Sequence, residues 1–86
     1  MTRAQFVADL VAFLNARLAL PGASVEPHTR LFAAGLLDSL RILELIAWTE
    51  RALGQRIPDE RIRMDYFWSP ARIAEVFIPE VAHAGS

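Results

Sequence analysis

Residues 31–40 have the sequence LFAAGLLDSL, which places a serine directly after an aspartate where a loop leads into a helix. Asp38 is a good N-cap, because its carboxylate accepts from the free N–H groups of a helix start and suits the positive end of the helix dipole. We expect Ser39 to point into solvent, where a modifying enzyme can reach its hydroxyl. A helix N-terminus also favours an attached phosphate. Ser39 is therefore a candidate phosphoester site.

Ordinary capping offers an alternative explanation of the same residues. An aspartate and a serine are common at any helix start. From average residue usage, the tripeptide Asp38-Ser39-Leu40 is expected by chance in about a few per cent of chains this long. Taken alone, the tripeptide favours capping, so its surroundings must decide.

The residues after Ser39 predict a helix that ends near Leu53, with Gly54 as its C-cap. Apolar spacings of three and four define its core-facing side. That predicted side consists of Ile42, Leu43, Leu45, Ile46, Thr49 and Leu53. The opposite, solvent-facing side is predicted to consist of Arg41, Glu44, Trp48, Arg51 and Gln55.

Trp48 has two interpretations. It either packs on a neighbouring helix or loop, or it anchors a partner protein, since tryptophan and arginine are enriched at interface hot spots. Its place between Arg41 and Arg51 on the predicted exposed side favours the second interpretation.

Upstream, apolar spacing predicts a first helix from about Thr2, its N-cap, to Leu20. Residues 21–37 then predict a loop of unusual length for so small a domain, and such loops are often functional. Apolar residues, among them Val25 and Leu31, are expected to pin this loop to the core. Thr29 is a possible cap for a short helical turn over residues 30–33.

Downstream, Ile57-Pro58 forces an extended residue before a short helical stretch from Asp59 to about Met64. Ser69-Pro70 is a typical helix start, and the last helix is expected to reach about Ile78. The predicted fold is all-α. It is a four-helix bundle with three long helices, one short helix and a long loop between the first two. We expect one domain over residues 1–86, with an ordered core at about 2–79 and a loose C-terminal tail.

Composition excludes several classes of function. The net charge of −1 argues against a nucleic-acid binder, which usually shows a basic surface. No run approaches the roughly 20 apolar residues that span a bilayer, so we expect a cytoplasmic protein without membrane insertion. The chain has no cysteine, so any thiol chemistry needs an added cofactor. Nothing in the sequence pairs His28 or His83 as metal ligands or catalytic bases.

An enzyme with Ser39 as nucleophile is a rival hypothesis. Such a serine needs an oriented base and an oxyanion site. The sequence contains no Gly-x-Ser-x-Gly motif, and the core is too small to build a substrate pocket around His28. Both observations disfavour catalysis.

With these features together, the sequence resembles the acyl carrier protein family. Members have four helices, a long first loop and an Asp-Ser-Leu motif opening the second helix, which Asp38-Ser39-Leu40 matches. The resemblance extends over Val7–Phe77 and is closest to D-alanyl and related aminoacyl or peptidyl carriers. Further matching segments are Gly35-Leu36-Leu37, Glu44-Leu45, Ile57-Pro58 and Ser69-Pro70 to Ile73-Ala74.

The resemblance implies a specific function. A phosphopantetheinyl transferase would move 4'-phosphopantetheine from coenzyme A to Ser39, with Asp38 and Leu40 completing the attachment motif. An adenylating acyl or aminoacyl ligase would load the arm with a thioester, and a downstream transferase or condensing enzyme would receive the cargo. The chain itself would be a monomer that catalyses nothing.

The sequence departs from fatty acid synthesis carriers on its second helix. Arg41 and Arg51 stand where those members are often acidic, with Trp48 between them, although Glu44 and Glu50 remain. We therefore expect a dedicated partner in a specialised pathway, contacted by Arg41, Glu44, Trp48 and Arg51. The alternative is a helical interaction module, a degenerate carrier that is no longer modified.

Overall fold

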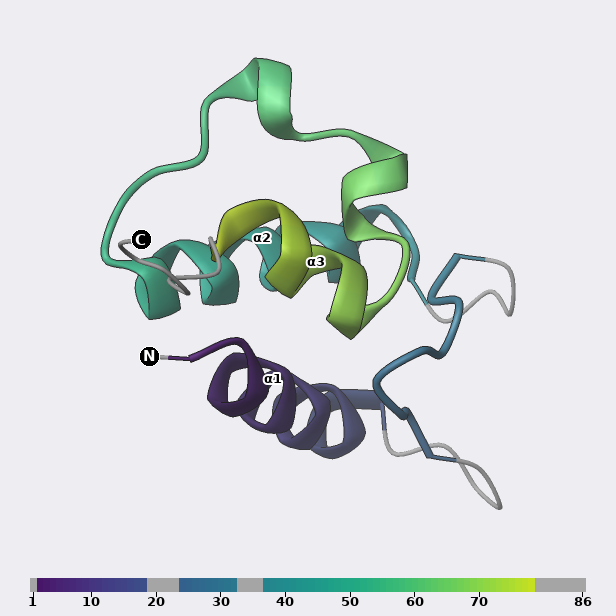
Figure 1. Cartoon of the computed structure of the whole chain (residues 1–86). Coiled ribbons are helices and arrows are strands. Elements are labelled where there is room, and N and C mark those ends of the chain that lie inside the picture. The colour runs from purple at the N-terminus through teal and green to yellow at the C-terminus, as the bar shows by residue number, and fades with distance from the viewer. Residues whose placement is uncertain (1, 19–23, 33–36, 79–86) are drawn as a thin grey trace.

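The computed structural model describes residues 2–18, 24–32 and 37–78, in which helices are joined by turns and loops and no strand occurs (Figure 1). The predicted all-α class is confirmed for this part of the chain. The α-helices are α1 (Arg3–Leu18), α2 (Ser39–Leu53) and α3 (Pro70–Phe77), and two 3₁₀ helices are η1 (Asp59–Arg61) and η2 (Met64–Phe67).

Short polar residues fix the helix ends where the sequence predicts them. Thr2 Oγ1 accepts from the Gln5 N–H (3.1 Å) while Gln5 Oε1 accepts from the Thr2 N–H (3.2 Å), a reciprocal pair that satisfies two donors. Ser69 Oγ accepts from the Arg72 N–H at the start of α3 (3.1 Å). Gly54 ends α2 with a φ of 73°, a conformation that favours glycine.

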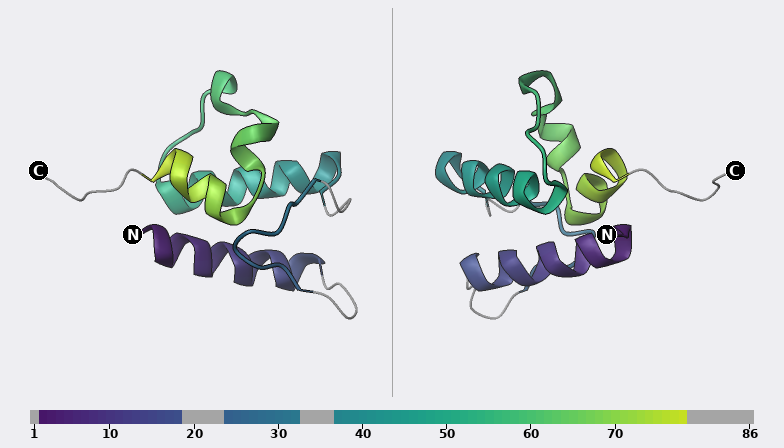
Figure 2. Two further views of the ribbon diagram at one scale, coloured as in Figure 1. Left: turned by 45° about the vertical axis from the view of Figure 1, so that its right-hand side comes forward. Right: turned by 90° about the vertical axis from the view of Figure 1, so that its left-hand side faces the viewer.

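The core lies where α1, α2 and α3 meet. Figures 1 and 2 show α1 running beneath the other two helices, while the 3₁₀ segments arch over α2 and return to α3. The buried apolar residues belong to α1, α2, η2 and α3 and to the segments that precede and follow α2. They are Phe6, Leu10, Leu14, Val25, Leu31, Leu37, Leu45, Ile57, Phe67, Ile73 and Ala74.

The loop residues 24–32 are tied to the helices, as the apolar positions predict. Val25 is buried, and its N–H and C=O both bond the side-chain amide of Asn15 on α1 (2.6 and 3.1 Å). The Leu31 N–H donates to the Trp68 carbonyl (3.0 Å), and Leu31 is fully buried. Residues 19–23 and 33–36 lie outside the described residues, so the predicted length of the loop stays a prediction.

One of the two predicted short elements differs in the structure. The turn expected over residues 30–33 runs into residues outside the described ones, so it stays a prediction; Leu31 and Phe32 lie in a turn, and Thr29 Oγ1 accepts from the Glu26 N–H (2.8 Å). The single short helix expected over residues 59–64 is replaced by η1 and η2, so the four-helix count does not hold for the described residues. Extended backbone at Arg63 separates the two turns, and η1 has no buried side chain that could hold a longer helix on the core.

The predicted faces of α2 also need correction. Leu43, expected in the core, is 62% exposed, whereas Trp48, expected in solvent, is partly buried. The indole of Trp48 stacks on Phe13 (5.5 Å between ring centroids) and meets Phe6 edge-on (5.4 Å). Because α1 offers two aromatic rings, the buried face of α2 is turned toward Trp48 and away from Leu43.

Candidate functional site

Ser39 is the first residue of α2 and is exposed. Asp38 precedes it in extended conformation (φ −110°, ψ −174°), and its Oδ1 accepts from the Arg41 N–H (2.8 Å). The predicted N-cap is therefore confirmed at Asp38, not at Ser39. Within the described ranges no hydrogen bond involves the Ser39 hydroxyl, which leaves it available for chemistry.

The chain emerges from the core just before this serine. Leu37 is buried, whereas Asp38, Ser39 and Leu40 are exposed, Leu40 by 68%. A buried anchor followed by a capped helix start holds the serine at the surface in a fixed position. An incoming enzyme can therefore reach the hydroxyl without opening the fold.

The start of α2 is also tied to the end of α1. Arg41 Nη1 donates to the Arg17 carbonyl (3.2 Å), and the Arg17 guanidinium forms an ion pair with the Glu44 carboxylate. A guanidinium near the last carbonyls of α1 also complements that helix dipole. No local pattern in the sequence points to this role of Arg17, because the two helix ends are brought together only by the tertiary fold.

The chemistry at this position suits a covalent phosphoester. The Ser39 hydroxyl, which has no hydrogen-bond partner among the described residues, stands beside the N–H groups that a helix N-terminus directs at an anion. In the same part of the chain no hydrogen bond joins a base to this hydroxyl, and His28 is exposed in the loop. The residues therefore fit an attached phosphate better than a serine nucleophile.

A family model for the phosphopantetheine attachment site matches residues 8–76, which run from α1 through α3. The chain belongs to this family. No curated protein and no solved structure shows a significant match to it. Members carry acyl groups on a covalent 4'-phosphopantetheine, are modified by a phosphopantetheinyl transferase and interact with partner enzymes. The chain is thus a carrier and not an enzyme.

The surface of the carrier beside Ser39 is apolar. Among the described residues five large hydrophobic side chains are exposed, and four of them lie at the start of α2 or in residues 62–64. Leu40 and Leu43 are one helical turn apart on α2, while Met64 is 63% exposed. A cleft of about 270 Å³ lies between α2 and residues 62–64, lined by Phe32, Ile42, Ile62, Arg63 and Met64.

Both arginines and carboxylates carry charge on this surface, and Asp38 beside Ser39 is exposed. Arg51 is exposed near the end of α2, and Arg41 is partly buried against α1. The pKa of Arg63 is raised above its ordinary value, first by its hydrogen bond to Asp65 and then by the charge of that carboxylate. The Arg63 guanidinium therefore remains positive at any physiological pH. The structure does not bring Trp48 onto the same surface.

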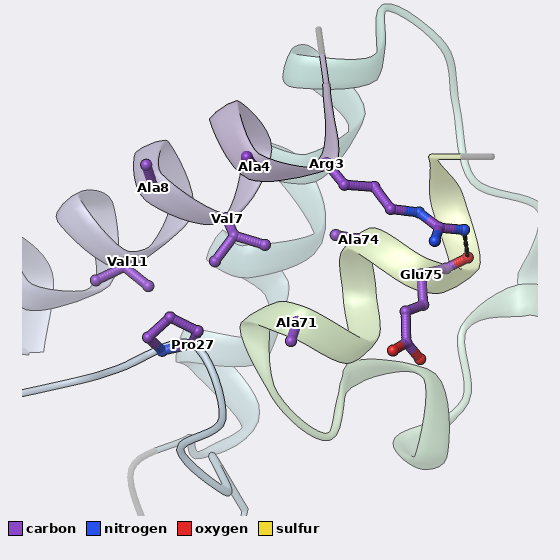
Figure 3. A pocket seen from close by; sticks show the side chains of 9 residues that line it. All are labelled: Arg3, Ala4, Val7, Ala8, Val11, Pro27, Ala71, Ala74 and Glu75. Atoms are coloured by element: carbon purple, nitrogen blue, oxygen red, sulfur yellow. Dashed lines mark hydrogen bonds between the residues drawn. The ribbon is translucent and has the colours of Figure 1, made fainter. Parts of the chain in front are cut away.

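A larger hollow lies elsewhere on the carrier, between α1 and α3 (Figure 3). It has a volume of about 520 Å³, and no residue lining it belongs to α2. Arg3 closes one end by donating to the carbonyls of Ile78 (2.7 Å) and Glu75 (3.2 Å). The lining residues are Arg3, Ala4, Val7, Ala8, Val11, Pro27, Ala71, Ala74 and Glu75.

The described part of the carrier contains neither a membrane-spanning helix nor a metal-binding cluster. None of its helices there has the length and apolarity needed to cross a bilayer. No group of three or more His, Asp or Glu side chains in the same residues is arranged to hold a metal ion. His83 lies outside the described residues.

Proposed function

We propose that the carrier bears 4'-phosphopantetheine on Ser39 and delivers an acyl or aminoacyl group from an adenylating ligase to a downstream transferase or condensing enzyme. The observation that supports this assignment most is the exposed Ser39 hydroxyl, which has no hydrogen-bond partner among the described residues and follows the Asp38 cap. Once attached, the arm supplies a thiol for thioester formation, which the cysteine-free chain lacks.

The residues around Ser39 take separate roles in this proposal. Asp38 fixes the first turn of α2 through the Arg41 N–H, so the attachment point keeps its orientation. Leu40, exposed next to the serine, offers an apolar contact to the transferase. Arg41, Glu44 and Arg51 face partner enzymes. Trp48 is packed on α1 and acts by holding α2 in place.

The arginines on α2 favour a dedicated partner in a specialised pathway over the enzymes of fatty acid synthesis. We propose that the carrier works as a monomer in the cytoplasm. The sequence contains no cysteine, so no disulfide indicates an oxidising compartment. The cargo itself would be set by the ligase that loads the arm.

Intact-mass spectrometry tests the attachment. The full chain is incubated with coenzyme A and a phosphopantetheinyl transferase of broad specificity, and we expect a gain of one phosphopantetheine. Ser39→Ala should show no gain, whereas Ser24→Ala, which removes an exposed loop hydroxyl, should be modified like the wild type. An unmodified wild type beside an active control carrier would refute the proposal and favour the unmodified interaction module.

A further inference from the structure

Residues 58–65, here called the arch, lie between α2 and α3 and have no buried side chain. The arch contains η1 and the first half of η2, and Figures 1 and 2 show η1 on the side of α3 that faces away from α1. By contrast, Ile57 just before the arch and Phe67 just after it are buried. Burial of apolar surface therefore fixes the two ends of the arch but not its middle.

Several polar contacts of the arch stay inside it. The Ile62 N–H donates to the Asp59 carbonyl (3.0 Å), which closes the turn of η1. The Arg63 guanidinium pairs with the Asp65 carboxylate two residues further on (3.1 Å). These contacts give the arch its shape, but they do not hold it on the rest of the molecule.

The side chain of Arg61 leaves the arch and contacts the end of α3. Its Nη2 donates to the Val76 carbonyl (3.1 Å), and its guanidinium lies over the Phe77 ring (5.0 Å to the centroid). Val76 and Phe77 are the last residues of α3, where a cation complements the helix dipole. Among the described residues no other hydrogen bond or ion pair joins η1 to a helix. A bond from Arg72 Nε to the Asp65 carbonyl (3.3 Å) holds only the last residue of the arch.

We infer that Arg61 is a latch: it holds the arch on the end of α3, and when its two contacts break, the arch moves away while Ile57, Phe67 and the three α-helices stay in place. Local opening of this kind occurs where a segment has few buried contacts and exposed main-chain hydrogen bonds. The latch works whether or not Ser39 is modified, so it goes beyond the proposed function.

Opening of the arch changes the apolar cleft beside α2. Three of the five residues that line this cleft belong to the arch. The other two, Phe32 and Ile42, are partly buried and lose part of their cover when the arch moves away. Ile42 lies about one helical turn after Ser39. Arg61 therefore controls, from the end of α3, how much apolar surface is exposed near that serine.

Limited proteolysis of the full chain tests the latch. A protease specific for glutamate has one site in the arch, after Glu60. Because the protease needs an opened segment, the initial rate of cleavage there follows the population of the open arch when reclosing is fast. We expect Arg61→Ala to raise this rate about tenfold, which corresponds to about 1.4 kcal/mol. A hydrogen bond to a charged group and an exposed cation–π contact together supply an effect of this size.

Three comparisons make the measurement specific. Arg61→Lys keeps the charge and should stay within about threefold of the wild type. Arg56→Ala removes an exposed arginine outside the arch that makes no hydrogen bond or ion pair in the described part of the chain, and it should match the wild type. Cleavage after Glu44 and Glu50, both inside α2, should stay at the wild-type rate in every variant. Each rate after Glu60 is divided by that of a synthetic peptide of residues 56–68 with the same substitution, which removes direct effects on the protease.

A wild-type rate after Glu60 in Arg61→Ala would overturn the inference, because the arch would then be held without this side chain. An equal rise in Arg56→Ala would attribute the effect to net charge. A parallel rise after Glu44 and Glu50 would show that the whole chain unfolds. Either of these results would also overturn the latch.

Discussion

Trp48→Ala is expected to destabilise the carrier by about 3 kcal/mol. The indole makes two aromatic contacts with α1, with centroids 5.4 Å from Phe6 and 5.5 Å from Phe13. Such pairs contribute about 0.5–1.5 kcal/mol each, and burial of part of the indole adds about 1–2 kcal/mol. Together these contributions give about 2–5 kcal/mol. We take about 3 kcal/mol, the lower end of the roughly 3–5 kcal/mol measured for aromatic-to-alanine changes in cores, because Trp48 is partly exposed.

This loss is large for a chain of 86 residues. A domain of that length has a free energy of unfolding of about 4–13 kcal/mol. With a urea m-value of about 1–3 kcal/mol/M, the midpoint should fall by about 1–3 M. Far-UV circular dichroism is the appropriate probe, because the mutation itself removes one of the two tryptophans that fluorescence would follow.

Two further variants make the test specific. Trp48→Phe keeps a ring against α1 and should lose only about 1 kcal/mol. Trp68→Ala removes an indole that is 39% exposed and lies under the Arg30 guanidinium at 5.5 Å, so it should also lose about 1 kcal/mol. If Trp48→Ala cost less than about 1 kcal/mol, or less than Trp68→Ala, the packed position of Trp48 would be refuted.

Two other predictions concern α2. Gly54→Ala should destabilise the chain by about 1 kcal/mol in urea denaturation, because the φ of 73° strains an alanine although its Cβ would meet no neighbour; a neutral effect would contradict the left-handed cap. Leu43→Gln should change stability by less than about 0.5 kcal/mol, whereas Leu45→Ala should cost about 2–5 kcal/mol, since only Leu45 is buried. If thermal unfolding showed equal losses of stability for the two variants, the assignment of Leu43 to the exposed side and of Leu45 to the buried side of α2 would be wrong.

The helix starts and the end of α2 could be predicted from the sequence because they depend on neighbouring residues. Thr2, Asp38 and Ser69 each bond an N–H group three residues further on, and Gly54 adopts its left-handed conformation at the end of α2. Such interactions need no knowledge of the rest of the fold. The exposed position of Ser39 followed from the same local reasoning.

The orientation of α2 could not be predicted in this way. Spacing shows that a helix has an apolar side, but Leu43 and Trp48 lie near its two edges, and the packing of α1 decides which of them is covered. Phe6 and Phe13 lie more than 30 residues away from Trp48 in the sequence. The same limit applies to Arg17, which meets Glu44 only in the folded chain.

Because Ser39 belongs to α2 itself, its position is rigidly related to Leu43 and Arg51 on the same helix. The 15 residues of α2 form a rod about 22 Å long, capped at both ends. For any protein that binds α2, the position and orientation of the Ser39 hydroxyl, and so of a group attached to it, are therefore fixed relative to the contact surface. The same helix therefore provides the contact surface and fixes the position of the attachment point. An enzyme that binds α2 needs no second contact to locate that point.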